Sequence, residues 1–519
     1  MSAPRRPRVV VVGNGMAGAR VVDELRALDP GGLLQVTVLG EESVPAYNRV
    51  LLSEVLAGRH RPDDIALSRG RAGEDDVRLG LSAVAIDRDA RLVHTGDGGT
   101  VEYDVLVLAT GSRPFVPPVD GLLEPDGTLV AGAHAFRTLD DCRDIEASAR
   151  EARRAVVLGG GLLGLEAARG LAGRGLQVVV VHNSTHLMER QLDPSAGRVL
   201  RRTLATQGVS VRLDATTVEV VRDDVGRLAG VLLDDGGMVL GDLLVVACGV
   251  RPEVSLARSA GLLVERGVVV DDRMRSVSDD RIYAIGECAQ HAGEVCGLVA
   301  PAWEQAAVAA RHITGTDPDA AYSGSPTVTR LKASGVDLAA MGESVVDDDA
   351  VLEDPDAELV VLSDPSRGTY GKLVLRHGRV TGAILVGVPG AVGTVTQLFD
   401  RGSLAPVDRA GLLFPGRRAA AAVVDSPSHL PRSAQVCRCN GVTKGAIQDC
   451  VLAGAVTVDA VAERTRATTG CGGCRDAVAG IVDWVRASDP ALGRPATTPA
   501  ESHAPVTPVV AVGGERRPV

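Results

Sequence analysis

The chain has 519 residues, of which 45% are hydrophobic and only 2% aromatic, and its formal net charge is −11. This length exceeds what one hydrophobic core supports, so several domains are expected, with cores built from Val, Leu, Ala and Ile. The acidic charge argues against nucleic acid as a partner, and without an apolar run of about 18 residues no membrane-spanning helix is expected. The nine cysteines and the absence of a signal-peptide pattern predict reduced thiols in a cytoplasmic protein.

The first predicted element is a buried strand at residues 8–12 (RVVVV), which runs directly into the sequence GNGMAG. Three glycines of this segment, Gly13, Gly15 and Gly18, have the spacing of a dinucleotide-binding turn. The first permits the tight turn, the second lets a pyrophosphate approach the backbone, and the third lets the following helix pack on the strand. A second strand (LQVTVLG) ends beside Glu41, where a carboxylate can bind ribose hydroxyls.

The pattern recurs in RRAVVLGGGLLGLEAARGLAGRGLQVVVVHNS, where Gly159, Gly161 and Gly164 have the same spacing between two predicted strands. This second unit lies between two similar segments, YDVLVLATGSRP at residues 103–114 and DLLVVACGVRP at residues 242–252. Paired segments of this kind are expected where the chain crosses from one nucleotide domain into the other and back. The sequence therefore predicts two α/β units, the second inserted into the first.

A later predicted strand, RIYAIGECAQ, ends in Gly286 and Glu287. Together with the two glycine turns and Gly111 of the first crossing segment, it resembles the two-dinucleotide-domain flavoprotein reductases over residues 7–315. The resemblance implies that the first turn binds the adenosine half of FAD and that the inserted unit binds NAD(P)H. It implies that Glu287 holds the ribityl chain, although most relatives have Asp there, and that Glu166 lies near flavin N5 and the nicotinamide. From the residues alone, Glu166 could also be a first-turn acid stabilised by the helix dipole.

The segment PAYNRVLLSEVL would, by the same resemblance, pass under the flavin. Its candidate contacts to the isoalloxazine or the pyrophosphate are Asn48, Arg49 and Ser53, although the segment could also be a simple helix start. Disulfide reductases of this architecture need a redox cysteine pair beside the flavin, whereas no cysteine precedes Cys142 here, and Cys248 is expected as a packing residue in a buried strand. Electrons that reach the flavin are therefore expected to leave by another route.

The choice between NADH and NADPH stays open at the sequence level. An NAD-specific site usually carries an acid after the second strand of its unit, whereas this chain has His182 and Asn183. Arg190 could reach a 2′-phosphate, but a surface arginine is more often only solvated.

Four cysteines near the C-terminus, Cys437, Cys439, Cys471 and Cys474, form a C-x-C…C-x-x-C frame around two segments with helical periodicity. Four thiolates can hold zinc or a 2Fe–2S cluster, and they can also form two disulfides, which a reducing compartment disfavours. The frame closely resembles the bacterioferritin-associated-ferredoxin-like 2Fe–2S domain, with C-x-C-N-x-V-T followed by G-C-G-x-C. The resemblance gives all four cysteines as cluster ligands and leaves Cys450 as a thiol of the core.

The whole chain is therefore expected to be an α/β protein with two interleaved Rossmann-like domains, a small α+β domain and a small helical cluster domain. Residues 321–420 resemble the small C-terminal domain of the same reductases. The expected divisions are 1–117 and 251–316 for the FAD domain, 118–250 for the NAD(P)H domain, 321–420 for the small domain, 421–433 for a linker, 434–486 for the 2Fe–2S domain and 487–519 for a disordered tail.

The domain order resembles the front half of the large subunit of NAD(P)H-dependent nitrite reductases and the electron-transfer subunits of assimilatory nitrate reductases. The sirohaem part of the nitrite reductases needs a further cysteine set that this sequence lacks, so we expect that the chain does not itself reduce nitrite. The resemblance implies electron transfer to a separate molybdenum-containing nitrate reductase subunit. Two alternatives remain: a reductase for a separate sirohaem nitrite or sulfite reductase, and a ferritin-docking or redox-sensing protein.

Overall fold

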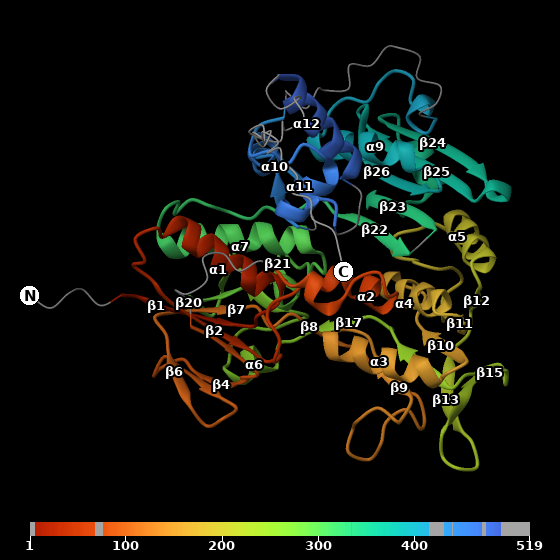
Figure 1. Ribbon diagram of the computed structural model, residues 1–519, viewed down its shortest axis with the longest axis horizontal. Coiled ribbons are helices and arrows are strands. Elements are labelled where there is room, and N and C mark those ends of the chain that lie inside the picture. The colour runs from red at the N-terminus through yellow and green to blue at the C-terminus, as the bar shows by residue number, and fades with distance from the viewer. Residues whose placement is uncertain are drawn as a thin grey trace, which may run out of the picture.

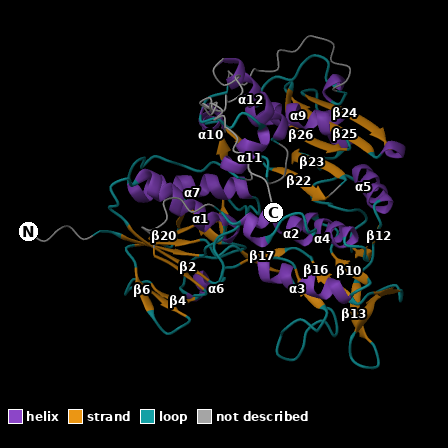
Figure 2. Ribbon diagram, viewed as in Figure 1, coloured by secondary structure: helices purple, strands orange, loops and turns teal. Residues whose placement is uncertain are grey.

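The structure is a computed structural model that describes residues 6–67, 76–333, 335–414, 430–437, 440–469 and 474–488. Two nucleotide-type units lie side by side, the first at the left of Figure 1 and the second at the lower right. A five-stranded antiparallel sheet lies above the second unit, and three short C-terminal helices lie above the first. Figure 2 shows helices flanking the sheets of both units, as expected for strands that are buried on both faces.

The first unit is built on an eight-stranded sheet in the order β21-β18-β19-β20-β7-β1-β2-β3. Strand β1 pairs in parallel with β2 on one side and with β7 on the other, and its valines are almost fully buried. Helices α1 and α7 pack against each other beside this sheet. These elements are β1 (Arg8–Val12), α1 (Met16–Leu28), β2 (Gln35–Gly40), β3 (Asp76–Leu79), β7 (Val105–Leu108), β18 (Val268–Val270), β19 (Arg275–Ser276), β20 (Asp279–Ala284), β21 (Ala289–His291) and α7 (Val299–Thr314).

The second unit repeats this plan around β10, which pairs in parallel with β11 and with β16 in the sheet β12-β11-β10-β16-β9. A twisted antiparallel ribbon of three strands adds to one end of the unit. These elements are β9 (Ala133–Ala135), α3 (Leu139–Glu151), β10 (Arg154–Leu158), α4 (Leu162–Gly173), β11 (Gln177–Val181), α5 (Pro194–Thr206), β12 (Val209–Arg212), β13 (Thr217–Arg222), β14 (Leu228–Leu233), β15 (Met238–Leu240) and β16 (Leu243–Val246).

The two similar crossing segments of the sequence lie next to each other. Strand β8 (Ser112–Pro114) pairs antiparallel with β17 (Val250–Pro252), with Arg113 opposite Arg251. The chain therefore enters and leaves the second unit at one place. Smaller elements of the first unit are α2 (Leu52–Leu56), β4 (Ala83–Asp87), β5 (Leu92–Thr95), β6 (Thr100–Glu102), α6 (Ser255–Ser259) and the 3₁₀ turns Arg49–Leu51, Pro62–Ile65 and Gly286–Cys288.

The antiparallel sheet has the order β22-β23-β26-β25-β24 and shares a hydrophobic core with α4 and α5 of the second unit. A polar contact reinforces this packing, because the Tyr370 hydroxyl donates to Asp193, which caps the start of α5, over 2.6 Å. These elements are β22 (Val328–Ala333), β23 (Val336–Gly342), α8 (Asp348–Glu353), β24 (Ala357–Asp364), β25 (Thr369–Arg376), β26 (Arg379–Val386), α9 (Pro389–Arg401) and the 3₁₀ turns Pro365–Arg367 and Ala410–Leu412.

The C-terminal helices form a small body with a hydrophobic core of its own, in which Cys437, Cys450 and Cys474 are buried. Helices α10 and α11 begin where the hydroxyls of Thr443 and Thr457 accept backbone N–H groups, as N-cap residues do. Residues 421–429 of the predicted linker and residues 489–519 of the predicted tail lie outside the described residues. The elements are β27 (Gln435–Cys437), β28 (Val442–Thr443), α10 (Lys444–Leu452), α11 (Val458–Thr465) and α12 (Arg475–Ser488), which ends two residues beyond the predicted limit of 486.

Across the described part of the chain, none of the helices has the length and apolarity that a membrane span requires. The buried residues instead form several hydrophobic clusters, one of which joins α2 of the first unit, the second unit and the antiparallel sheet.

Candidate functional site

A single large cleft, of about 1220 Å³, lies between the two nucleotide units. Its volume exceeds the roughly 300–1,000 Å³ of an ordinary small-molecule site, so it can hold more than one cofactor-sized ligand. Both glycine turns open into it, together with β8, β17 and the start of α7. The predicted site residues that line the cleft are Gly13, Gly15, Glu41, Arg49, Gly111, Gly159, Gly161, Glu166, Gly286 and Glu287. Four others, Gly18, Asn48, Ser53 and Gly164, are not among its lining residues.

The first glycine turn connects β1 to α1. Gly13 has φ +109°, and a Cβ atom there would lie 2.2 Å from the carbonyl oxygen of Ala109, the residue directly after β7. A Cβ atom on Gly18 would lie 1.9 Å from the Gly13 carbonyl oxygen, so this glycine serves helix packing behind the cleft. Gly15 caps α1 without a side-chain hydrogen bond, which leaves the first backbone N–H groups of the helix directed at the cleft.

The second turn connects β10 to α4 and has nearly the same geometry. Gly159 also has φ +109°, and its Cβ position lies 2.3 Å from the Ala247 carbonyl oxygen. A Cβ atom on Gly164 would lie 2.1 Å from the Gly159 carbonyl oxygen, whereas one on Gly161 would meet no atom within 4 Å. The middle glycine of each turn is thus the least crowded, because a Cβ atom on Gly15 would meet only the Arg49 Nε atom, at 3.8 Å, and the approach of a pyrophosphate requires such space.

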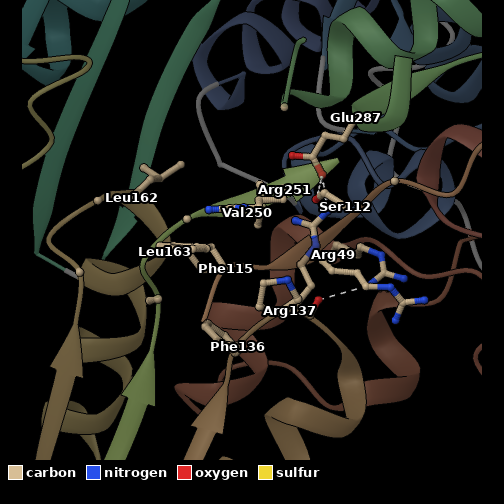
Figure 3. A pocket seen from close by; sticks show the side chains of 18 of the residues that line it. Arg49, Ser112, Phe115, Phe136, Arg137, Leu162, Leu163, Val250, Arg251 and Glu287 are labelled. Atoms are coloured by element: carbon tan, nitrogen blue, oxygen red, sulfur yellow. Dashed lines mark hydrogen bonds and ion pairs between the residues drawn. The ribbon is translucent and has the colours of Figure 1, made fainter. Parts of the chain in front are cut away.

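Glu287 lies near the base of the cleft at the end of the β20 segment. The Ser112 hydroxyl of β8 donates to its Oε2 atom over 2.6 Å, and the Arg137 guanidinium pairs with the same oxygen. Figure 3 shows these three side chains converging from three different segments. The Arg137 Nε atom is buried without a hydrogen-bond partner in the described structure, although Arg137 itself lines the cleft. The sequence could have indicated Ser112, because it lies in the GSRP part of the first crossing segment, whereas no motif marks Arg137.

Glu41 directly follows β2, and its side chain is 65% exposed at the mouth of the cleft. Its Oε1 atom lies 3.3 Å from the Arg113 Nη2 atom, and Arg113 also pairs with Glu253. Because the pair with Arg113 is solvent-exposed, it contributes little to stability. The Glu41 carboxylate therefore remains available to a hydroxyl-bearing ligand.

Glu166 lies on α4 and is only 4% exposed, with its side chain at the wall of the cleft. Its interpretation as an acid in the first helical turn is wrong, because α4 has no acidic residue in that turn. The hydrogen bonds that the Arg59 guanidinium donates to Glu54 raise its pKa, as do the charges of Glu54 and Glu166, against the opposing effect of burial. A buried carboxylate is thus held close to a cation at the junction of the two units.

The three predicted residues of the PAYNRVLLSEVL segment point in different directions. Arg49 lines the cleft, where its Nη1 atom donates to the Arg137 carbonyl oxygen over 3.2 Å. Asn48 is fully buried and turns away from the cleft toward Asn440 of the C-terminal body. Ser53 is 2% exposed, and its hydroxyl has no hydrogen-bond partner among the residues the structure covers. The segment starts helical turns at Arg49 and Leu52, which confirms its interpretation as a helix start, whereas its contact with the flavin stays a prediction.

Two of the four framed cysteines, Cys437 and Cys474, are buried in one hydrophobic cluster, at the end of β27 and directly before α12. The other two, Cys439 and Cys471, lie outside the described residues. Cys450 is 8% exposed within α10 and packs in the same core, which confirms its interpretation as a core thiol.

Cys248 differs from its sequence interpretation. It was expected in a buried strand, but β16 ends at Val246, and Cys248 lies in the following loop, where it lines the cleft beside the second glycine turn. Burial raises the pKa of its thiol to about 11, so the thiol is protonated at neutral pH. Burial likewise raises the pKa of the Cys142 thiol to about 12. Among the described residues that line the cleft, Cys248 has no second thiol with which to form a redox disulfide.

The C-terminal body contacts the first unit at the back of the cleft wall. The Asn48 Nδ2 atom donates to Asn440 Oδ1 over 2.8 Å, and Asn440 Nδ2 donates to the Arg466 carbonyl oxygen over 2.6 Å. The Arg466 guanidinium in turn donates to the backbone oxygens of two residues of the first unit, Asp64 and Ala66.

A second contact joins the loop between β27 and β28 to α7. Gly441 has φ +63°, and a Cβ atom there would lie 2.5 Å from the ring of Trp303. The Arg20 guanidinium carbon lies 5.2 Å from the centroid of the same ring, and its Nη1 atom lies 3.3 Å from that Cβ position. The segment at Gly441, which follows the strand that ends in Cys437, is therefore packed tightly against the first unit.

Comparison with known proteins identifies the class. Residues 7–312 match the family described as pyridine nucleotide-disulphide oxidoreductase, and the chain belongs to this family. Residues 327–390 match the rubredoxin NAD⁺ reductase C-terminal domain, and residues 435–484 match the BFD-like [2Fe-2S] binding domain. The chain is thus an NAD(P)H-dependent flavoprotein oxidoreductase with FAD, NAD(P)H and a 2Fe–2S cluster as its cofactors, and its α/β fold class is confirmed.

Among relatives, the chain is 35% identical to the assimilatory nitrate reductase electron transfer subunit of Bacillus subtilis, over 96% of this chain and 62% of that protein. It is 36% identical to the nitrite reductase [NAD(P)H] of the same organism, over 93% of this chain and 58% of that protein. The chain therefore spans about three-fifths of the length of these relatives. The putidaredoxin reductase–putidaredoxin complex has the same fold over 80% of this chain, with a TM-score of 0.69 and 24% identity.

Proposed function

We propose that this protein oxidises NAD(P)H and delivers the electrons to a separate catalytic subunit, a molybdenum-containing assimilatory nitrate reductase. The observation that carries the proposal is the junction between Asn440 and Asn48, which packs the cluster domain onto the wall of the cofactor cleft. The similarity to a nitrate reductase electron transfer subunit supports the choice of partner.

On two separate segments, the residue that contacts the cluster domain is directly next in sequence to a residue that lines the cleft. Asn48 contacts the cluster domain while its neighbours Tyr47 and Arg49 line the cleft. Trp303 contacts Gly441 while Ala302, directly before it on α7, lines the cleft. A thin wall of protein thus separates the two compartments, and a short separation favours electron transfer between groups bound on either side.

We assign the cleft residues roles that follow from their positions. The backbone at Gly15 and Gly161 receives the two pyrophosphates, and Glu41 binds the adenosine ribose of FAD. Glu287, oriented by Ser112 and Arg137, binds the ribityl hydroxyls. Arg49 contacts the flavin or its pyrophosphate, Gly111 and Gly286 shape the floor of the cleft, and Glu166 lies beside the nicotinamide. The predicted roles of Asn48 and Ser53 as flavin contacts have no support from their orientation.

The buried position of Cys437 and Cys474 suits thiolate ligands that are shielded from water, and we propose that Cys439 and Cys471 complete the set. When bound, FAD accepts two electrons from NAD(P)H as a hydride, and the flavin and the cluster pass them on one at a time. The protein supplies the distance between the groups, the shielding from water, and the docking of the cluster domain.

Two variants test the order of transfer. Gly161→Val fills the open position at the second turn, so NAD(P)H should no longer reduce the flavin, while bound FAD and its reduction by dithionite should persist. Cys437→Ser should have the opposite effect, with the flavin still reduced by NAD(P)H but the iron–sulfur spectrum and the reduction of the partner lost. Wild-type nitrate reduction by the Cys437→Ser variant with its partner would rule out the cluster as the exit route.

A second partner, a separate sirohaem nitrite reductase, is favoured by the similarity to nitrite reductases. The two candidates are separated by offering the anaerobically reduced protein each catalytic subunit in turn and following reoxidation of the flavin. Reoxidation only by the sirohaem protein would replace the molybdenum subunit in the proposal.

A further inference from the structure

In the second unit, no acidic residue directly follows the strand that corresponds to β2 of the first unit. In the first unit, Glu41 follows β2 and faces the cleft. In the second unit, the residues after β11 are His182, which is 7% exposed, and Asn183. A carboxylate nevertheless lines this part of the cleft, because Glu189 returns to it from the loop before α5.

This return loop is anchored to the glycine turn itself. The Met188 backbone N–H donates to the Gly160 carbonyl oxygen over 3.0 Å, and Met188 adopts φ +53°. Leu187 and Met188 are fully buried, and the Met188 carbonyl oxygen accepts the N–H groups of Gln191 and Leu192 over 2.8 and 2.9 Å. Glu189 therefore follows a fixed backbone and is not part of a free surface loop.

His182 fixes the side chain of Glu189. The Gly160 backbone N–H donates to His182 Nδ1 over 3.2 Å, so that nitrogen is an acceptor and the ring proton lies on Nε2. His182 Nε2 then donates to Glu189 Oε2 over 3.0 Å. The ring itself is held in place, because a Cβ atom on Gly160 would lie only 2.8 Å from it.

We propose that Glu189, held by His182, binds the adenosine ribose hydroxyls of NADH and excludes the 2′-phosphate of NADPH. The inference deepens the proposed function, on which it rests in taking the second glycine turn as the nicotinamide nucleotide site. One carboxylate oxygen accepts from His182, and the other has no hydrogen-bond partner in the described part of the chain, so it can accept a ribose hydroxyl. A 2′-phosphate in the same place would meet a fixed like charge.

Arg190 is the one cation that argues for the opposite preference, because it lines the same part of the cleft. Its side chain is exposed, and no hydrogen bond or ion pair of its guanidinium is found among the described residues. An unanchored arginine must lose its side-chain freedom to bind a phosphate, whereas Glu189 is already in place. The preorganised carboxylate therefore decides the preference.

The test measures binding and not turnover, so it does not depend on the electron acceptor. NAD⁺ and NADP⁺ are titrated calorimetrically into the oxidised, FAD-loaded full-length protein. The wild type should bind NAD⁺ at least tenfold more tightly than NADP⁺, and Glu189→Gln should reduce this ratio by about tenfold, mainly through tighter NADP⁺ binding. Retained flavin absorbance shows that the variant is folded.

Three further variants sharpen the test. His182→Ala should reduce the ratio nearly as much as Glu189→Gln, whereas His182→Gln, which keeps one acceptor and one donor, should restore it. Glu151→Gln removes an exposed carboxylate at the end of α3, away from the cleft lining, and should leave the ratio unchanged. A merely structural role of His182 would weaken both nucleotides equally and leave their ratio constant.

The opposite results overturn the inference. A wild-type preference for NADP⁺ that Arg190→Gln abolishes would assign the decision to the arginine. An unchanged ratio in Glu189→Gln, or an equal change in Glu151→Gln, would remove Glu189 from the ribose site while leaving the proposed function intact. Failure of the wild type to bind either nucleotide would refute the proposed function together with this inference.

Discussion

The two glycine turns share one backbone but differ in what surrounds them. Gly13 and Gly159 have the same φ of +109°, and both lie against a carbonyl oxygen of the neighbouring strand segment. The residue after the second strand differs: Glu41 is an exposed carboxylate, whereas His182 is buried and holds a carboxylate from elsewhere. The shared part is dictated by backbone packing and suits any dinucleotide, so the identity of the ligand must be read from the side chains around it.

The helices after the two turns also differ in the side chains that they contribute to their surroundings. Helix α1 presents Arg20 to the face of Trp303 and so supports the contact with the cluster domain. Helix α4 instead presents the buried Glu166 to the cleft. The first unit is therefore the one that receives the cluster domain, and the second contributes a charged group to the space between the units.

The largest effect is expected when the shared backbone is broken. Gly13→Ala places a Cβ atom 2.2 Å from a carbonyl oxygen at a positive φ. We expect the free energy of unfolding to fall by about 2–4 kcal/mol and FAD to be lost. Gly159→Ala has the equivalent clash in the second unit and should abolish nucleotide binding while FAD is retained. Flavin content after gel filtration and urea unfolding followed by circular dichroism measure both effects; the same loss of FAD in the two variants would contradict a division of ligands between the turns.

The next effect concerns the junction between the first unit and the C-terminal body, for which the described residues of the second unit show no counterpart. Asn440→Ala removes the oxygen to which the Asn48 side chain donates, and losing this buried hydrogen bond should cost about 0.5–1.5 kcal/mol. Docking of the cluster domain should weaken, so reduction of the cluster after the flavin, followed by stopped-flow absorbance, should slow about tenfold or more. Glu463→Ala, on the exposed side of α11, is the control. Unchanged kinetics in Asn440→Ala, with a normal cluster spectrum, would show that the junction does not govern transfer.

A smaller effect is expected for the pH dependence of alkylation at Cys248. The first unit has Thr110 at the corresponding place after β7. Burial raises the pKa of the Cys248 thiol from 9.0 to about 11. Its alkylation by iodoacetamide, followed at this residue by mass spectrometry, should therefore remain slow at pH 7–9 and rise through pH 11. Because the folded pKa lies above the unfolded one, the stability contributed by the neutral thiol is complete below pH 9 and declines as pH rises toward 11. Fast labelling at pH 7 would contradict this burial.

The smallest effect is expected at Ser53. Its buried hydroxyl has no partner within the described structure, so Ser53→Ala should change the free energy of unfolding by less than about 1 kcal/mol, in either direction. FAD affinity should not change, whereas Arg49→Ala, which removes a cation from the cleft, should weaken it. A more than tenfold loss of FAD affinity in Ser53→Ala would return Ser53 to the flavin site.

Much of this architecture could be predicted because the determinants are local. The strand–glycine–helix pattern requires particular residues within a few positions, and the two crossing segments, alike in sequence, proved to be paired strands. The remaining features depend on distant parts of the chain. Glu189 reaches the cleft only because its loop folds back on Gly160, and Asn48 faces Asn440, almost four hundred residues later. No short pattern can encode such contacts, and Cys248 was misplaced because two residues separate it from the end of its strand.

The pairing of β8 with β17 indicates how the second unit could be deleted from the chain. Pro114 and Val250 are partners in the register, so the second unit is attached through two strands that end side by side. Joining these residues by a two-residue turn would convert the crossing into an ordinary β-hairpin and delete the whole insert. The eight-stranded sheet draws its strands only from outside the insert, so its hydrogen bonding would be intact. In this sense the second unit can be deleted from the chain without breaking a strand of the first unit's sheet.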